Sequence, residues 1–516
     1  MGKFFLFIAI AIFLSYCSSS TNLNTADNLK VNGVAFIKSN LEFLASDDLE
    51  GRNTATHSEE IASQYIASEF KKYGILPYGD STTHFQDFNV IVSSFDEKST
   101  ISVFGNNETA DNELRLGDDF ISQNAHAFDK NLFGKQFPLV FAGFGITADE
   151  YDYDDYTTID PAGKVVIVLW GEPYSEDENF FNGLQQTKYS SPFTKIASAM
   201  SKGAVGVLLI PNQQIISMWG MLQSMATGES VDYAGSDESG NKIIPAALIT
   251  LNAAQKLFEG SGKILSNIQN EVEAHEIPEG FDLSRQVKFN FTINSEKKTV
   301  RNVVGIIEGS DPVLKNEYVT IGAHYDHVGI SGGQIYNGAD DNASGTVGVL
   351  EAARELLGLN KNKRSIIFIL YTGEEKGLLG SNYFVNNFEK INDVVANINL
   401  DMVGRKGIDS IYCIGSDRTS RELDDLLKQV NERTVKFTLD YSLSSGNYFY
   451  QSDHYSYVRK NIPVVFFNDN MLADLHKPTD DYDKINCEKI YKTAELVKEL
   501  ALEIANLDHR LTFNEN

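Results

Sequence analysis

The second half of the chain contains three short apolar runs that each end at a histidine or at acidic residues. The runs are rich in β-branched and aromatic side chains, which is typical of strands buried in a parallel sheet. They are residues 318–323 before His324, residues 366–371 before Gly373-Glu374-Glu375, and residues 394–400 before Asp401. Ligand sites of open α/β sheets lie beyond the carboxyl ends of the strands, so these side chains should converge. The sequence therefore predicts an α/β sheet with a functional site at that edge.

The residues that should converge are of types that bind metal ions. Two further clusters complete them, Gly338-Ala339-Asp340-Asp341-Asn342 and Leu475-His476-Lys477-Pro478. Imidazole and carboxylate ligands without a thiolate suit zinc, manganese or cobalt. Two histidines and three acids exceed the three protein ligands that one catalytic zinc usually takes. If one carboxylate bridges, the same five residues give three ligands to each of two ions, an arrangement that promotes hydrolysis.

The combined pattern H-Y-D, G-A-D-D-N-A-S-G, G-E-E, N-L-D-M and a late histidine resembles that of the M28 family of two-zinc aminopeptidases. The resemblance covers about residues 290–510 and a segment near the N-terminus. It implies a mixed, mainly parallel sheet flanked by helices, the zinc-peptidase fold. It also implies two zinc ions per chain, with cobalt or manganese as substitutes, and peptides or small proteins with free N-termini as substrates.

The resemblance also implies a role for each metal ligand. His324 and Asp401 would bind one ion, Glu375 and His476 the other, and Asp340 would bridge them. In the family, the peptide bond that here joins the two aspartates of the bridging motif is often cis.

The same resemblance assigns the residues around the metal ions. Glu374 would be the general base, which takes a proton from water and passes it to the leaving amine. Asp326 would orient the first histidine ligand by accepting its other N–H group. Relatives supply a tyrosine hydroxyl shortly before a Ser-Asp-His element, which here is Ser452-Asp453-His454. Tyr448 or Tyr450 fits this place, with Tyr450 as the candidate, although a packing role stays open for both.

The N-terminus has the pattern of an export signal. Lys3 is followed by about a dozen mostly apolar residues and then by small ones, which is typical of a secretory signal peptide and too short for an ordinary membrane span. Leu14-Ser15-Tyr16-Cys17 resembles a bacterial lipobox, in which Cys17 is lipidated. We expect residues 1–17 to be a lipoprotein signal peptide and residues 18–30 a flexible tether. The protein would then be exported and anchored by lipid in the bacterial cell envelope.

The remaining chain divides into three parts. Residues 31–119 would be the N-terminal part of the peptidase domain, and Asp47, Asp48 and Arg52 there are interpreted as a capped loop. Residues 120–275 contain strand and turn patterns that resemble an inserted, β-rich protease-associated domain, and residues 290–510 would be the catalytic domain. The insertion would border the active-site cleft or restrict access to it, and a purely structural role stays open.

Composition excludes several other classes. The formal charge of −27 argues against nucleic acid as a partner. Cys413 and Cys487 are the only cysteines after the lipobox, so there is no disulfide framework, and the two are either free or paired. No later stretch is apolar enough to cross a membrane, which leaves the lipid anchor as the expected membrane contact.

Two functional classes compete, a metal-dependent aminopeptidase and a catalytically inactive binding protein with the same fold. The intact ligand set and the Glu374 base favour the enzyme. Carboxypeptidases and glutaminyl cyclases share the fold and remain alternatives. The ligand set favours two ions over the single ion of the cyclases. No cluster for a substrate carboxylate is recognisable among the dispersed arginines, and the carboxylate-rich site favours an α-ammonium group; the arginines are Arg405, Arg418, Arg421 and Arg459.

Overall fold

The computed structural model describes residues 25–105, 109–122, 127–177, 179–183, 186–226, 229–234, 242–359, 361–405, 407–469 and 473–514. The predicted signal peptide and Cys17 lie outside these residues, so export and lipid anchoring stay predictions from the sequence. The end of the predicted tether differs from expectation, because helix α1 (Thr25–Leu44) already begins at Thr25. Apolar residues in the later turns of this helix, including Ile37 and Leu41, are buried in the main core.

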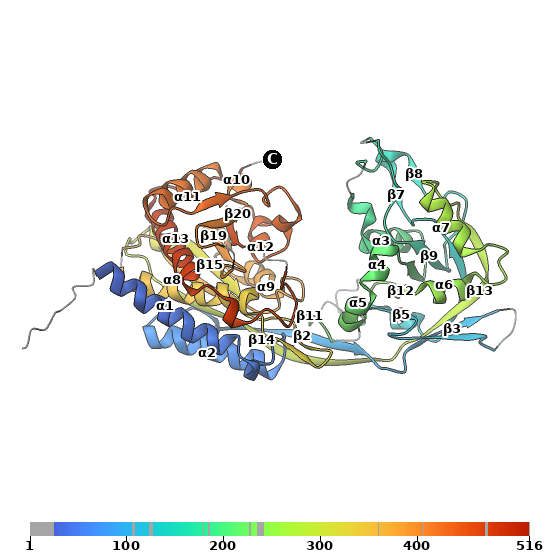
Figure 1. The fold of residues 1–516 in the computed structure, drawn as a ribbon, viewed down its shortest axis with the longest axis horizontal. Helices are drawn as coiled ribbons and strands as arrows, with labels where there is room; N and C mark the ends of the chain where they lie inside the picture. The colour runs from blue at the N-terminus through green and yellow to red at the C-terminus, as the bar shows by residue number, and fades with distance from the viewer. Residues whose placement is uncertain are drawn as a thin grey trace, which may run out of the picture.

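Ten of the described strands form one mixed sheet, seen with its covering helices on the left of Figure 1. In order across the sheet they are β11 (Ser230–Tyr233), β2 (Phe85–Phe95), β14 (Ile293–Ile307), β18 (Ser365–Tyr371), β15 (Tyr318–His324), β19 (Val394–Leu400), β22 (Val464–Asn468), β20 (Ser410–Ile414) and β21 (Thr438–Asp440), with β1 (Leu76–Pro77) paired to β14. β18, β15, β19 and β22 are parallel, and antiparallel pairs flank them. The predicted mixed α/β fold is therefore confirmed, with parallel pairing concentrated in the centre.

Helices cover both faces of this sheet because the side chains of a strand alternate between its faces. In β18, Ile366 and Phe368 enter the larger core, whereas Ile367 and Ile369 enter the core on the other face. The larger core includes residues of α1, α2 (His57–Tyr73), α8 (Gly345–Leu359), α11 (Arg421–Arg433) and α13 (Cys487–Asn506). The opposite core includes residues of α9 (Leu379–Asn387) and α12 (His454–Val458). A short helix, α10 (Ser416–Thr419), precedes α11.

Eight other strands form a second sheet with its own hydrophobic core, the separate lobe on the right of Figure 1. Its order is β4 (Asn112–Arg115), β3 (Thr100–Phe104), β13 (Phe281–Asn290), β6 (Gln136–Phe141), β9 (Val165–Leu169), β10 (Gly206–Ile210), β12 (Ala246–Ile249) and β5 (Phe120–Ile121). Its helices are α3 (Pro192–Ser201), α4 (Gln213–Ser217), α5 (Trp219–Ala226), α6 (Leu251–Phe258) and α7 (Leu265–Glu273). Two small hairpins pair β7 (Thr147–Ala148) with β8 (Tyr153–Asp154) and β16 (Gly329–Ser331) with β17 (Gln334–Tyr336).

The second lobe is wider than the expected insertion, residues 120–275. β3, β4 and β13 lie outside those bounds but belong to its sheet, because β13 pairs with both β3 and β6. The paired strands β2 and β14 lead out to this lobe and back from it (Figure 1). Both Cys413 and Cys487 are free thiols. Among the described residues, none of the helices combines the length and apolarity that a membrane crossing requires.

Gly33 lets α1 pack closely on α8 and α13, which cover the main sheet, and we predict that Gly33→Ala destabilises the fold. A Cβ atom there would lie 2.3 Å from a ring carbon of Tyr491 and 2.5 Å from a carboxylate oxygen of Glu351. Such overpacking lowers the free energy of unfolding by about 1–3 kcal/mol. Gly358→Ala is the matched control, since no atom lies within 4 Å of its added Cβ and helical alanine is favoured by about 0.5–1 kcal/mol. Urea unfolding that ranks the two variants in the opposite order would contradict this packing.

Candidate metal centre

The predicted ligands lie where three neighbouring parallel strands end. His324, the last residue of β15, pairs with Tyr371, the last residue of β18. Asp401 directly follows β19, the other neighbour of β15, and Glu374 follows β18 by three residues. All of these side chains therefore leave the sheet at one edge.

The first group of ligands consists of His324, Asp341 and Asp401. One ligand atom from each lies within 4.8 Å of the others, and all three side chains are buried. His324 Nε2 is 3.4 Å from Asp341 Oδ1 and 3.4 Å from Asp401 Oδ1. The three atoms surround one point, as the ligands of an ion do.

The second group consists of His327, Asp341 and Glu375, with His476 at its rim. His327 Nδ1 lies 2.8 Å from Glu375 Oε1 and 3.8 Å from Asp341 Oδ2. The His476 side chain is 44% exposed, and its Nε2 lies 3.0 Å from Glu375 Oε2 and 3.3 Å from Asp341 Oδ2. The sequence analysis did not single out His327, although it belongs to the same short motif as the first histidine ligand.

Asp341, and not Asp340, is the aspartate that belongs to both groups. Its Oδ1 faces the first group and its Oδ2 faces the second, at the distances given above. The Asp340 carboxylate turns away and accepts a hydrogen bond of 2.8 Å from the backbone N–H of Gly404. The cis peptide bond is likewise one residue later than expected, between Asp341 and Asn342. Two adjacent acids share one motif, and spacing alone does not tell which side chain points to the histidines.

The adjacent Glu374 and Glu375 differ in protonation. Burial and the neighbouring carboxylates raise the pKa of Glu374 well above its ordinary value, against the opposing effect of His324. Burial also acts to raise the pKa of Glu375, but His476 and His327 outweigh it and hold that pKa well below the ordinary value. Partial desolvation acts to lower the pKa of His476, but Glu375 and Asp341 outweigh it and raise that pKa to about 11. Such a divergence between neighbouring acids is typical of a proton donor beside a charged ligand.

Unsatisfied buried atoms show that a metal ion fits these residues. His324 Nε2 and Asp401 Oδ1, which both belong to the first group, are buried and have no hydrogen-bond partner of good geometry. Leaving such groups unpaired is unfavourable by about 1–3 kcal/mol each, and more for charged groups. Nitrogen and carboxylate donors that converge without thiolates match zinc. The donor set and its orphaned atoms are therefore those of a metal centre.

Asp326 holds the loop of Glu374 rather than the imidazole of His324. Its Oδ1 accepts the backbone N–H of Glu374 at 3.2 Å, and its Oδ2 accepts the hydroxyl of Thr54 at 2.8 Å. His324 Nδ1 is closer to the backbone oxygen of Asp326, at 3.2 Å, than to its carboxylate, at 3.8 Å. The contact to the His324 imidazole that was expected from the Asp326 carboxylate is thus made by the Asp326 backbone carbonyl. A sequence motif cannot reveal this difference.

The Ser-Asp-His element contributes a contact that the sequence analysis could not assign. Ser452 Oγ donates to Asp401 Oδ2 at 2.8 Å and accepts from Asn399 at 2.9 Å, which orients this ligand. His454 is buried, which lowers its pKa to about 3, so it is neutral. Tyr450 is 48% exposed, and its described ring contacts are with Phe449, Tyr455 and Arg418 rather than with the ligands. Its place beside the reaction stays a prediction.

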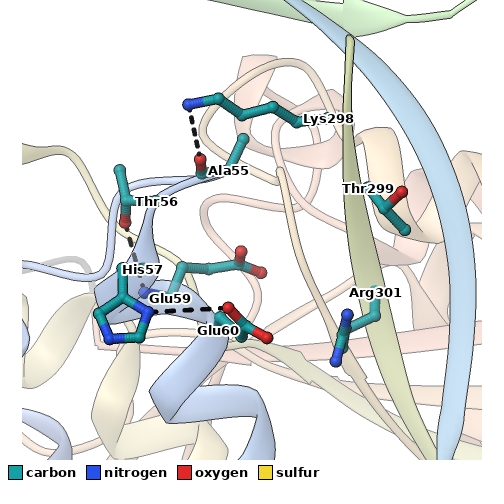
Figure 2. Close-up of a pocket in the computed structure, with 8 residues that line it drawn as sticks. All are labelled: Ala55, Thr56, His57, Glu59, Glu60, Lys298, Thr299 and Arg301. Carbon is teal, nitrogen blue, oxygen red and sulfur yellow. Dashed lines mark hydrogen bonds and ion pairs between the residues drawn. The ribbon is translucent and has the colours of Figure 1, made fainter.

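A further buried acid, Glu59, contacts the residues that follow β15 and β18. Glu59 accepts hydrogen bonds from the hydroxyls of Tyr325 and Thr372, and it forms part of the wall of a pocket of about 330 Å³ (Figure 2). Lys298 and Arg301 of β14 form the opposite side of this pocket. Burial is the main cause that raises the pKa of Glu59 to about 7. The pocket contains none of the metal-binding groups.

Comparison with known proteins assigns the site to a family. Residues 302–501 match the family model described as Peptidase family M28. This part of the chain, which contains both ligand groups, is similar to peptidase family M28. Leucine aminopeptidase 1 of Sclerotinia sclerotiorum is 33% identical to the chain over 213 residues, which cover 38% of this chain and 54% of that protein. Aminopeptidase YwaD of Bacillus subtilis is 30% identical over 210 residues, which cover 39% and 44%. The chain therefore spans about half the length of the curated relatives it matches.

Solved structures share the fold over both lobes of the chain. The aminopeptidase from Aneurinibacillus sp. strain AM-1 superposes with a TM-score of 0.57 at 20% identity, covering 93% of this chain and 95% of that one. BSAP, a zinc aminopeptidase from Bacillus subtilis, gives a TM-score of 0.53 at 21% identity, covering 91% and 94%. This likeness confirms the predicted zinc-peptidase fold.

The position of Asp341 predicts opposite outcomes for the two neighbouring aspartates. Asp341→Asn should lose most bound zinc, because it removes the charge that both groups share. Asp340→Asn should keep it, since that carboxylate faces the Gly404 amide. Elemental analysis of zinc per chain tests this. If the Asp341 variant keeps zinc and the Asp340 variant loses it, the shared ligand is Asp340, as the sequence analysis expected.

Glu59 predicts a pH-dependent stability. Its pKa is about 7 in the folded protein, against an ordinary value of 4.5, so the fold binds this proton more tightly than the unfolded chain does. Its contribution is fully present below pH 4.5 and is lost as the pH rises through 7, by about 3 kcal/mol in total. Glu59→Gln should remove this dependence, measured as the difference in unfolding free energy from the parent between pH 5 and pH 8. Glu60→Gln, on the partly exposed face of the same helix turn, controls for the lost charge, and parallel curves for parent and Glu59→Gln would contradict the role of burial.

Proposed function

We propose that this chain is a zinc-dependent aminopeptidase with two metal ions. The observation that carries the proposal is Asp341, whose two oxygens face two separate ligand groups. A carboxylate shared in this way is what a pair of hydrolytic metal ions needs. The relatives described as leucine aminopeptidase and zinc aminopeptidase support the same reaction class.

Five residues would hold the two ions. His324, Asp341 and Asp401 would bind one, and Asp341, Glu375 and His476 the other. Bound divalent cations supply Lewis acidity, which activates water and polarises the peptide carbonyl. This arrangement favours a hydrolase over a binding module, because an inactive protein needs no such convergence of unsatisfied donors.

Glu374 is the residue best placed to move the proton. Its Oε2 lies 4.0 Å from His324 Nε2, beside the first group but outside both groups of ligands. Its raised pKa shows that its surroundings favour the protonated form. In its ionised form, which nearby cations would favour, this carboxylate would take a proton from the attacking water and then give that proton to the leaving amine. Asp326 keeps the group in place through the backbone N–H of Glu374.

The charge of the site favours the amino end of a peptide. Four acidic side chains that are each at most 11% exposed lie at this edge of the sheet, namely Asp341, Glu374, Glu375 and Asp401. An α-ammonium group has a pKa of about 7.7–8.0 and is largely charged at neutral pH. Held beside these acids, it would place the first peptide carbonyl at the metal ions, so that one residue is released from the N-terminus at a time.

We also propose that the insertion, residues 120–275, which the sequence likens to a protease-associated domain, borders the substrate cleft through its strand β11. β11 lies within the expected insertion but pairs with β2 of the main sheet. Its Tyr233 donates a hydrogen bond to the carbonyl of Leu379, the first residue of α9. That helix follows the loop of Glu374, so the insertion contacts an element next to the proposed base.

The proposed function predicts that peptides with a free amine are cleaved and that their N-acetylated counterparts are cleaved at least about tenfold more slowly. Acetylation removes the positive charge that the acidic site would hold. Release of amino acids from each pair of peptides, followed by mass spectrometry, measures this. Equal rates, or release of C-terminal residues first, would contradict aminopeptidase activity.

Glu374→Gln is the control that connects cleavage to this site. It should keep two zinc ions per chain and the fold, while turnover falls by about 10²–10⁴, the usual contribution of a general acid–base group. Near-parental turnover in this variant would show that the hydrolysis comes from another group or from a contaminant.

A further inference from the structure

Arg52 is a fully buried arginine that contacts the metal-binding loops from behind. It lies in the segment 51–54, which is part of the connection between α1 and α2, and it is 1% exposed. Its guanidinium donates to the backbone carbonyls of Tyr325 at 2.8 Å, Asn337 at 2.7 Å and Gly338 at 2.9 Å, and also to that of Leu44. All four of these acceptors are backbone carbonyls, although a guanidinium normally pairs with a carboxylate. The contacts therefore fix the path of the backbone.

Three of these carbonyls belong to the two loops that carry metal ligands. Tyr325 directly follows His324, and Gly338 is three residues before Asp341. One planar group with N–H donors in a rigid fork thus spans the gap between the loops, which no flexible side chain with a single donor atom can do. The fourth carbonyl, of Leu44, ends α1 and holds the guanidinium to the N-terminal helix.

Neighbouring residues of the segment add contacts to the first of these loops. The backbone N–H of His327 donates to the carbonyl of Arg52 at 3.2 Å, and the hydroxyl of Thr54 donates to Asp326 at 2.8 Å. The N–H of Gly329 donates to the carbonyl of Gly51 at 3.2 Å. Gly51 has a φ of 71°, and an added Cβ would lie 2.3 Å from the backbone oxygen of Tyr336, so only glycine fits.

The charge of Arg52 complements the site. Burial lowers its pKa to about 10, against the opposing effect of four carboxylates, so it remains positive at neutral pH. Those carboxylates include Asp341 and Glu375, which face each other across the second group. A fixed cation behind them reduces their mutual repulsion.

We propose that the segment 51–54, through Arg52, is a positioning device that sets the separation between the His324 loop and the Asp341 loop. This inference rests on the proposed two-metal site and extends it to a part of the chain that supplies no ligand. A metal site must hold its ligands to within about 0.5 Å, so the device acts on how tightly the ions are held and on turnover.

A second buried arginine offers a matched control for a purely structural role. Arg364 is also 1% exposed, and its guanidinium donates to the carbonyls of Ile504, Leu507 and His509, with an added ion pair of 2.7 Å to Glu317. It immediately precedes β18, whose seven residues separate it by about 20 Å from the end that leads to Glu374. Its loss should affect the fold and not the metal centre.

The experiment compares Arg52→Lys with Arg364→Lys in the full chain loaded with zinc. Lysine keeps the charge but donates from one nitrogen, so it cannot span both loops. We expect Arg52→Lys to release zinc to a chelator about 10–100-fold faster and to lower kcat by a similar factor, with KM within about threefold, as outer-shell changes do. Arg364→Lys should lower Tm while zinc release and kcat stay within about twofold of the parent. The absorption spectrum of cobalt-loaded protein should shift only in the Arg52 variant.

Three outcomes would overturn the inference. In the first, the two arginine variants release zinc at the same rate and have the same cobalt spectrum. Arg52 would then be a structural residue only. If Arg52→Lys does not fold, Thr54→Val tests the same segment by removing one hydroxyl, and parental zinc release in that variant would contradict positioning by this segment. A parent protein that cleaves free-amine peptides while holding fewer than two zinc ions would overturn the inference together with the two-ion proposal. A parent that holds two ions but cleaves nothing would contradict the proposed activity alone, and zinc release and the cobalt spectrum would still decide the role of Arg52.

Discussion

The structure around the site depends on the confinement of like charges. Asp341, Glu374, Glu375 and Asp401 are collected at one end of a parallel sheet, where burial weakens solvent screening. At a separation of 4 Å and an effective dielectric constant of 20, two such charges repel by about 4 kcal/mol. Three histidines and the buried guanidinium of Arg52 offset part of this repulsion. Two divalent cations would offset the remaining repulsion, so that four acidic side chains could lie close together here.

The same confinement divides the acids into different roles without any difference in residue type. Glu375 lies between His327 and His476, which hold its pKa low. At its neighbour Glu374, burial and the nearby carboxylates outweigh His324 and raise the pKa. Asp401 is fixed by Ser452, and Asp341 is shared between the groups. Position relative to the histidines, more than chemical identity, therefore distinguishes a ligand from a proton carrier.

The sequence located the site but not its internal geometry. Apolar runs that end at His324 and Asp401 reveal strand ends, because burial on both faces leaves a local pattern that can be read without a structure. The choice between Asp340 and Asp341, in contrast, depends on which way each side chain points from the same loop. Arg52 depends on contacts with residues almost three hundred positions away, and its neighbourhood resembled an ordinary capped loop. Long-range contacts of this kind leave no periodic signal.

These long-range contacts connect the metal centre to the completion of the fold. Ligands come from loops after three strands and from the late His476 loop, and the carbonyls that Arg52 holds belong to two of those loops and to the end of α1. An unfolded chain cannot present this set, so ions that bind the site stabilise the native state over the unfolded one. Because the N-terminal segment supplies no ligand yet holds two ligand loops together, the docking of α1 and the segment 51–54 and the binding of metal should favour each other. The assembly of the metal centre is therefore a property of the whole first lobe rather than of the motif residues alone.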